Sequence, residues 1–174
     1  MNRKQFVFST LALGCLVLAS ASTESVSIAQ TDQVKTSMAG LQTMTVKLGA
    51  PKISGMDVVG GKDSPALYFG VTKMNNSVDL VDELVKKNGG TATLFVKAGE
   101  DYVRVATNVK KDDGSRAIGT ILDPKGPVFA AIRTGKPYYG DANILGKTYD
   151  TGYEPIKDSS GNVIGIYYVG YMKQ

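Results

Sequence analysis

The sequence TATLFVKAGEDYVRVATNV, residues 91–109, is the clearest structural signal in this chain. Two runs rich in valine, threonine and aromatic residues, 91–97 and 101–109, flank the pair Gly99-Glu100. Such residues favour strands, and a glycine between two such runs is typical of a tight turn. The segment therefore predicts a β-hairpin.

Three further strands are predicted after this hairpin, over residues 137–145, 147–157 and 163–172. Gly146 joins the first two strands, and the turn sequence DSSGN at 158–162 joins the last two. Links this short connect antiparallel neighbours. We therefore expect a five-stranded antiparallel sheet.

Three helices complete the predicted domain. The first begins at an N-cap formed by Thr31-Asp32 and carries a stripe of core-facing residues. That stripe consists of Val34, Met38, Leu41, Thr45 and Leu48. A second helix covers 78–90, and a short third helix lies within 123–135. This order of elements predicts an α+β domain with the helices segregated to one face of the sheet.

Residues 50–76 connect the first two helices and contain many glycine, proline and asparagine residues but few periodic apolar ones. The segment predicts a long loop with at most a short strand at 65–70. Long loops of this kind often shape a binding site.

The N-terminus has the pattern of a signal peptide. MNRK is basic, residues 6–19 form one apolar run, and Ala19-Ser20-Ala21 resembles a cleavage site. We expect a signal peptide over 1–21, with an alternative end at residue 29, and a single domain over 30–174. The exported product is then periplasmic or secreted. An uncleaved anchor helix and a lipid anchor on Cys15 are the alternatives.

Composition restricts the possible function. The 174 residues suffice for one domain with a core, and the formal charge of +4, or +2 without Arg3 and Lys4, is too small to indicate nucleic-acid binding. The chain has no histidine, and its one cysteine, Cys15, lies in the predicted signal peptide. The commonest general base and the usual zinc ligands are therefore missing. We predict no enzyme activity, no cofactor and no metal, with a hydrolase that uses paired carboxylates as the minor alternative.

Tyrosine is the unusual side chain, with nine residues, all at or after Tyr68. Because side chains alternate along a strand, Tyr149 and Tyr153 share one face of their strand. Tyr139 lies on the preceding strand. Several tyrosine hydroxyls on one sheet face would line a polar pocket, although each ring could equally fill the core.

Two arginines are the candidate ligand-binding cations. In the strand 101–109, the period of two places Tyr102, Arg104 and Ala106 on one face. Arg104 is therefore either exposed to solvent or on a face that another segment covers. A guanidinium group binds a carboxylate with two parallel hydrogen bonds. Arg116 could bind such a ligand or pair with Asp112 or Asp113.

Residues 78–170 contain the segments GGTATLFV, VRVATNV, DGSRAIGT, ILGKTYDTGYEPI and GNVIG in that order. In sequence and spacing these segments resemble the extracytoplasmic Cache sensor domain. The resemblance is to the single-module Cache 3/Cache 2 fusion type found in methyl-accepting chemotaxis receptors and sensor kinases. It implies a PAS-like sheet with a long N-terminal helix and a pocket for small molecules, often short organic acids. It also implies binding rather than catalysis.

Receptor relatives continue into a membrane helix, whereas this chain ends at Gln174. We therefore expect a free-standing module that binds a small organic anion and presents it to a membrane chemoreceptor or sensor kinase. The predicted site comprises Arg104, Arg116, Tyr139, Tyr149 and Tyr153. The alternative is a docking module whose pocket is vestigial. The first helix lacks a sustained heptad repeat, so we expect a monomer or a weak homodimer.

Overall fold

A computed structural model describes residues 21–173 of the chain. The predicted signal peptide lies outside the described residues except for Ala21. Within residues 21–173, no helix is long and apolar enough to cross a membrane.

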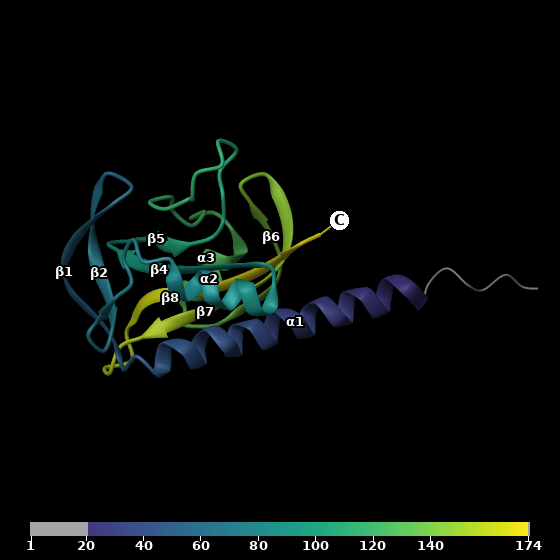
Figure 1. The fold of residues 1–174 in the computed structure, drawn as a ribbon, viewed down its shortest axis with the longest axis horizontal. Coiled ribbons are helices and arrows are strands. Elements are labelled where there is room, and N and C mark those ends of the chain that lie inside the picture. The colour runs from purple at the N-terminus through teal and green to yellow at the C-terminus, as the bar shows by residue number, and fades with distance from the viewer. Residues whose placement is uncertain (1–20, 174) are drawn as a thin grey trace, which may run out of the picture.

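The centre of the fold is a five-stranded antiparallel sheet (Figure 1). Its strands are β4 (Thr91–Ala98), β5 (Asp101–Thr107), β6 (Tyr138–Ile144), β7 (Lys147–Lys157) and β8 (Val163–Met172). They lie in the order β5-β4-β8-β7-β6, and every neighbouring pair is antiparallel. The predicted hairpin, the five strands and the α+β class are confirmed.

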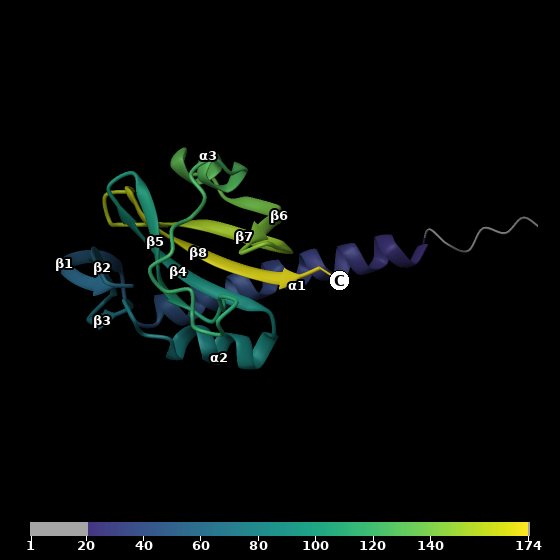
Figure 2. The same ribbon diagram turned by 90° about the horizontal axis from the view of Figure 1, so that it is seen from above.

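One face of this sheet is covered by α1 (Ala21–Val46) and α2 (Asp79–Asn88) (Figure 2). The predicted stripe on α1 is buried from Val34 to Thr45, whereas Leu48 lies beyond the end of the helix and is 36% exposed. The predicted N-cap is wrong, because the helix already begins at Ala21. The Thr31 hydroxyl donates to the Asp150 carboxylate (3.4 Å) from within the helix.

The opposite face of the sheet is covered by α3 (Pro127–Arg133) and by the loop that precedes it (Figure 2). Val128 and Ile132 of α3 pack into a second core cluster with Phe95 and Ile166 of the sheet. The prediction that all helices lie on one face is therefore wrong. Both faces of the sheet are apolar, so each is buried by a different set of helices and loops.

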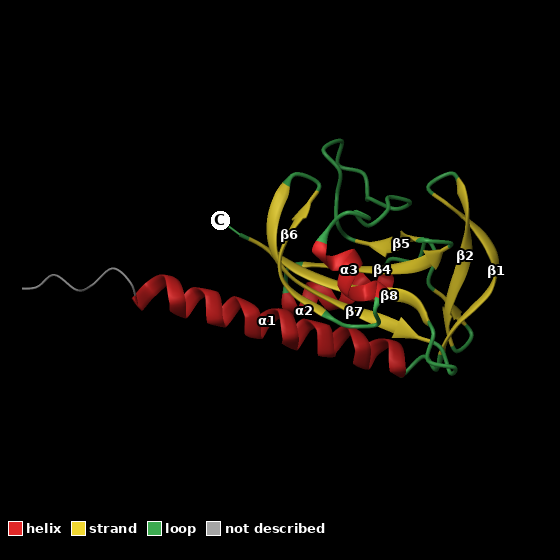
Figure 3. Cartoon of the chain, turned by 180° about the vertical axis from the view of Figure 1, so that it is seen from behind, coloured by secondary structure: helices red, strands yellow, loops and turns green. Residues whose placement is uncertain are grey.

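A second, three-stranded sheet replaces the predicted loop at 50–76. It consists of β1 (Pro51–Val59), β2 (Lys62–Phe69) and β3 (Thr72–Lys73), and it packs at one end of the larger sheet (Figure 3). β1 is an edge strand with most of its residues exposed, so its sequence shows little alternation. Gly60 and Gly61 (φ 59° and 81°) form the two-residue hairpin turn. This Gly-Gly pair was the available signal, because such a turn requires two positive φ angles.

Candidate ligand pocket

A pocket of about 500 Å³ lies between the α3-covered face of the sheet and the loop–α3 segment. Its volume is within the range of small-molecule sites. Residues from β5, β6, β7, α3 and the connecting loops line it: Arg104, Ile121, Leu122, Asp123, Gly126, Pro127, Val128, Asp141, Ala142, Asn143, Ile144, Leu145 and Tyr153.

Arg104 is the buried cation of this pocket, with only 4% of its surface exposed. Its Nη1 donates to the Thr120 hydroxyl (2.6 Å), and its Cζ lies 5.0 Å from the centre of the Phe95 ring. The buried Nε has no hydrogen-bond acceptor among residues 21–173. The guanidinium is thus held in place while part of its donor capacity is unused.

The register of the β4–β5 hairpin explains why Arg104 faces the pocket. Arg104 pairs with Phe95, which belongs to the core cluster on this face. The register shifts between Leu94 and Phe95, so β5 contains one extra residue there. Beyond this bulge the alternation reverses. Ala106 therefore packs into the core cluster on the face covered by α1 and α2, which we call the helical face. The predicted shared face is therefore right for Arg104 but wrong for Ala106.

Among residues 21–173, no carboxylate forms an ion pair with Arg104. Three ion pairs occur among the described residues, and none of them involves this side chain. Burial lowers the pKa of Arg104, and electrostatic interaction with Tyr153 and Tyr168 acts weakly in the opposite direction. An arginine nevertheless stays protonated in proteins, and an unpaired buried charge is costly. The pocket therefore has an electrostatic preference for an anion.

Tyr153 is the second candidate site residue that lines the pocket. It is 1% exposed, and its ring centre lies 4.9 Å from that of Tyr168. Its hydroxyl has no hydrogen-bond partner in the part of the chain that the structure describes. Burial raises the pKa of Tyr153 well above its ordinary value, so the hydroxyl remains a donor at neutral pH. It can donate to an anionic ligand.

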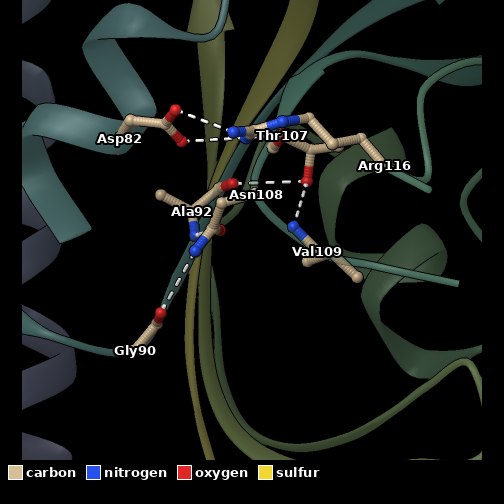
Figure 4. Close-up of polar contacts among 7 residues, drawn as sticks. All are labelled: Asp82, Gly90, Ala92, Thr107, Asn108, Val109 and Arg116. Carbon is tan, nitrogen blue, oxygen red and sulfur yellow. Dashed lines mark hydrogen bonds and ion pairs between the residues drawn. The ribbon is translucent and has the colours of Figure 1, made fainter. Parts of the chain in front are cut away.

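Arg116 does not line the pocket. Its Nη1 and Nη2 donate to the two carboxylate oxygens of Asp82 on α2, both at 2.8 Å (Figure 4). Nη1 also donates to the Thr107 carbonyl (2.8 Å). The expected partners Asp112 and Asp113 were the wrong ones. The structure thus gives Arg116 a role in joining the loop after β5 to α2.

Tyr139 and Tyr149 also lie outside the pocket lining. Tyr138 pairs with Tyr153, so Tyr139 points to the opposite face, where its hydroxyl donates to the Glu154 carboxylate. Tyr149 is on the pocket face but packs beside the second core cluster. The structure therefore brings Arg104 and Tyr153 together and separates the other three predicted residues from them.

Sequence reasoning missed the wall that the loop before α3 provides. Thr120, Ile121 and Leu122 run beside β5, with the Arg104 N–H donating to the Thr120 carbonyl (2.9 Å). Placing this loop on β5 required the tertiary fold. The available signal was the apolar run 118–122, which follows a polar turn.

The carboxylates in the pocket lining belong to Asp123 and Asp141. Asp123 is exposed and accepts from the Lys125 N–H (2.9 Å), while Asp141 pairs with Lys173 (2.6 Å). The described residues contain no group of three or more histidine, cysteine, aspartate or glutamate side chains that could hold a metal ion. The pocket chemistry is that of a binding site with one fixed cation.

Comparison with known families places the chain. The sequence model of the Cache 3/Cache 2 fusion domain matches residues 16–174. The chain belongs to this family. Cache domains are extracytoplasmic sensor domains that bind small molecules, and those of chemotaxis receptors are binding modules rather than enzymes.

Among solved structures, a protein described as "Methyl-accepting Chemotaxis protein X" is similar, with 18% sequence identity and a TM-score of 0.44. The match covers 87% of this chain and 61% of that chain. No curated protein matches the sequence.

Proposed function

We propose that this Cache domain binds a small organic anion, such as a carboxylate, in the pocket beside Arg104. The observation that supports this most strongly is a 4% exposed guanidinium with an unused Nε donor and no carboxylate partner among residues 21–173. A ligand carboxylate would supply the missing counter-charge. Charge-assisted hydrogen bonds of this kind are about twice as strong as neutral ones.

The proposed site consists of Arg104 and Tyr153. Arg104 supplies the positive charge, and Thr120 and Phe95 hold its guanidinium in a fixed orientation. Tyr153 supplies a neutral hydroxyl donor from the neighbouring wall. Pre-positioned donors lose little conformational freedom on binding, which favours affinity. Arg116, Tyr139 and Tyr149 are left out of this site, because their side chains lie elsewhere.

The proposal is tested by heating the protein with a panel of small monoacids and diacids and titrating the best one by calorimetry. A ligand at 100 times its dissociation constant should stabilise the protein by about 2.7 kcal/mol. Arg104→Ala should weaken binding at least tenfold, because losing one partner of a buried charge pair costs about 2–5 kcal/mol. Arg104→Lys should also weaken it, since an ammonium lacks the planar fork.

Arg116→Ala is the matched control, because it removes an arginine that lies outside the pocket. It should bind the same acid with unchanged affinity. Wild-type affinity in Arg104→Ala would remove Arg104 from the site, and the absence of binding by every acid would overturn the proposed function.

We further propose that the protein is exported and that a membrane chemoreceptor or sensor kinase reads its ligand-bound form. The basic start, the apolar run 6–19 and the family membership support export. N-terminal sequencing of the exported product should begin at Ser22 or Gln30. An intact Met1 in the membrane fraction would contradict this.

A further inference from the structure

Beyond Arg104 and Tyr153, the pocket wall is mostly apolar. Its apolar residues come from the loop before α3, from α3 itself and from the β6–β7 hairpin: Ile121, Leu122, Pro127, Val128, Ala142, Ile144 and Leu145. A small ion such as acetate would contact little of this surface. The wall instead offers burial to a ligand with an apolar part, and burial of apolar surface is favourable in proportion to its area.

Leu145 has a backbone conformation that is unfavourable for leucine. Leu145 and Gly146 form the two-residue turn between β6 and β7, and Leu145 has φ 51°. Turns with two positive φ angles favour Asn-Gly, whereas a branched side chain such as leucine is strained there. Leu145 is also 44% exposed, so it gains only part of the free energy of burial. Strained residues tend to occur at ligand sites.

Ile121, on the loop beside β5, is a second pocket-lining aliphatic residue that is largely exposed. It lines the pocket, yet it is 51% exposed. Two large aliphatic side chains in the pocket lining thus keep much of their surface in water. A ligand that covers them would remove this surface from water.

The charges of the lining limit the ligand further. Arg104 is the buried charged group, whereas the other charged lining residues, Asp123 and Asp141, are exposed carboxylates. A second carboxylate on the ligand would therefore meet either an apolar wall or carboxylate side chains, of which only that of Asp141 is paired with a lysine. Both environments disfavour a diacid.

We infer that the pocket takes a monocarboxylate with an apolar tail, whose carboxylate pairs with Arg104 and whose tail contacts Ile121 and Leu145. This inference rests on the proposed function and adds the class of acid to it. The apolar tail distinguishes this ligand class from acetate, which has almost no tail, and from diacids, whose second end is charged.

The first test is a calorimetric titration with acetate, butyrate, hexanoate and octanoate. Each added methylene group should tighten binding about three- to fourfold until the tail leaves the wall. Adipate, which has the length of hexanoate and a second carboxylate, should bind at least tenfold more weakly than hexanoate. Hexanoate with a terminal ammonium group reports whether Asp123 and Asp141 prefer a cation.

The second test is the variant Leu145→Asn. Asparagine tolerates the turn conformation, so the variant should be as stable as wild type or more stable in urea. Its affinity should rise several-fold less from acetate to hexanoate than that of wild type, because the tail loses its contact with Leu145. Val71→Asn is the control, because Val71 is a 91% exposed aliphatic residue outside the pocket. It should leave the affinity for both acids unchanged.

The outcomes separate the two proposals. Binding that does not strengthen from acetate to hexanoate, or adipate or the ammonium-bearing acid binding more tightly than hexanoate, would overturn the apolar tail and leave anion binding intact. Unchanged hexanoate affinity in Leu145→Asn would remove the tail contact. If no member of the series binds but another acid of the panel does, the apolar tail is overturned, and if no acid binds at all, the proposed function itself fails.

Discussion

The two faces of the five-stranded sheet both carry tyrosines, but they differ in how the polar groups are satisfied. On the helical face, Tyr139 donates to Glu154, Tyr167 bonds to Thr45 (3.0 Å) and Tyr171 bonds to Ser37 (2.7 Å). On the pocket face, Tyr138 and Tyr168 also have hydrogen-bond partners, whereas the Tyr153 hydroxyl and the Arg104 Nε have none among residues 21–173.

This difference separates structural polar groups from groups that are available to a ligand. A buried donor without an acceptor costs about 1–3 kcal/mol. Hydroxyl and carboxylate groups of α1 and β7 remove that cost on the helical face. On the pocket face, the residues that carry the unpaired donors, Arg104 and Tyr153, line a cavity, and we expect a bound anion to satisfy part of their donor capacity. Unused hydrogen-bonding capacity, rather than residue type, identifies the candidate site.

Alkaline pH should have the largest effect, because it acts on both faces. Burial raises the pKa of Tyr153 and Tyr168 on the pocket face and of Tyr167 on the helical face. In the unfolded chain these groups ionise near pH 10, so above that pH the unfolded state binds fewer protons than the folded one. The free energy of unfolding should be unaffected below about pH 10 and fall above it by about 1.4 kcal/mol per pH unit for each tyrosine.

This titration is followed by the ultraviolet absorbance of tyrosinate and by circular dichroism. Ionisation of the buried tyrosines should coincide with loss of structure. Complete tyrosinate formation near pH 10 in a protein that keeps its circular dichroism would contradict the burial of these hydroxyls.

Leu41→Ala tests the helical face alone. Leu41 is fully buried between α1 and the sheet, so its truncation should lower the free energy of unfolding by about 2–5 kcal/mol. The measurement is urea unfolding at neutral pH. Anion affinity, measured where the variant is folded, should stay within about twofold of wild type, since the pocket lies on the other face. A large loss of affinity would mean that the two faces are coupled.

A matched pair of variants, Tyr167→Phe and Tyr153→Phe, compares the faces directly. Tyr167→Phe removes a hydrogen bond to Thr45 and should lower the free energy of unfolding by about 0.5–1.5 kcal/mol without changing binding. Tyr153→Phe removes no protein hydrogen bond in the described residues, so stability should be retained while anion affinity falls. If both variants changed stability and binding equally, the tyrosine hydroxyls of the two faces would not differ in their roles.

The smallest effect is expected for Arg116→Ala. Its ion pair with Asp82 is bidentate, but the two side chains are 33% and 43% exposed. Such pairs usually contribute about 1 kcal/mol or less, and salt weakens them. Urea unfolding at low and high salt measures this contribution. A loss well above 1 kcal/mol would indicate that Arg116 holds the loop beside the pocket more firmly than its exposure suggests.

The sequence by itself determined the elements that depend on local patterns. The hairpin at 91–109 and the three C-terminal strands follow from turn residues and strand propensity, and the buried stripe of α1 follows from its helical period. The family follows from motifs whose order lies in the sequence. The β1–β2 hairpin was missed because an exposed edge strand has little alternation to reveal it.

Only the tertiary structure decided which arginine and which tyrosine face the pocket. Arg104 is buried because the loop before α3 runs beside β5, and Arg116 is paired because α2 brings Asp82, 34 residues earlier in the chain, beside it. Tyr153 and Tyr139 differ because the β6–β7 register places them on opposite faces. The local sequence determines which side chains share a face of a strand. Packing between distant segments determines which of these side chains are buried, which find a hydrogen-bond or ion-pair partner and which line the pocket.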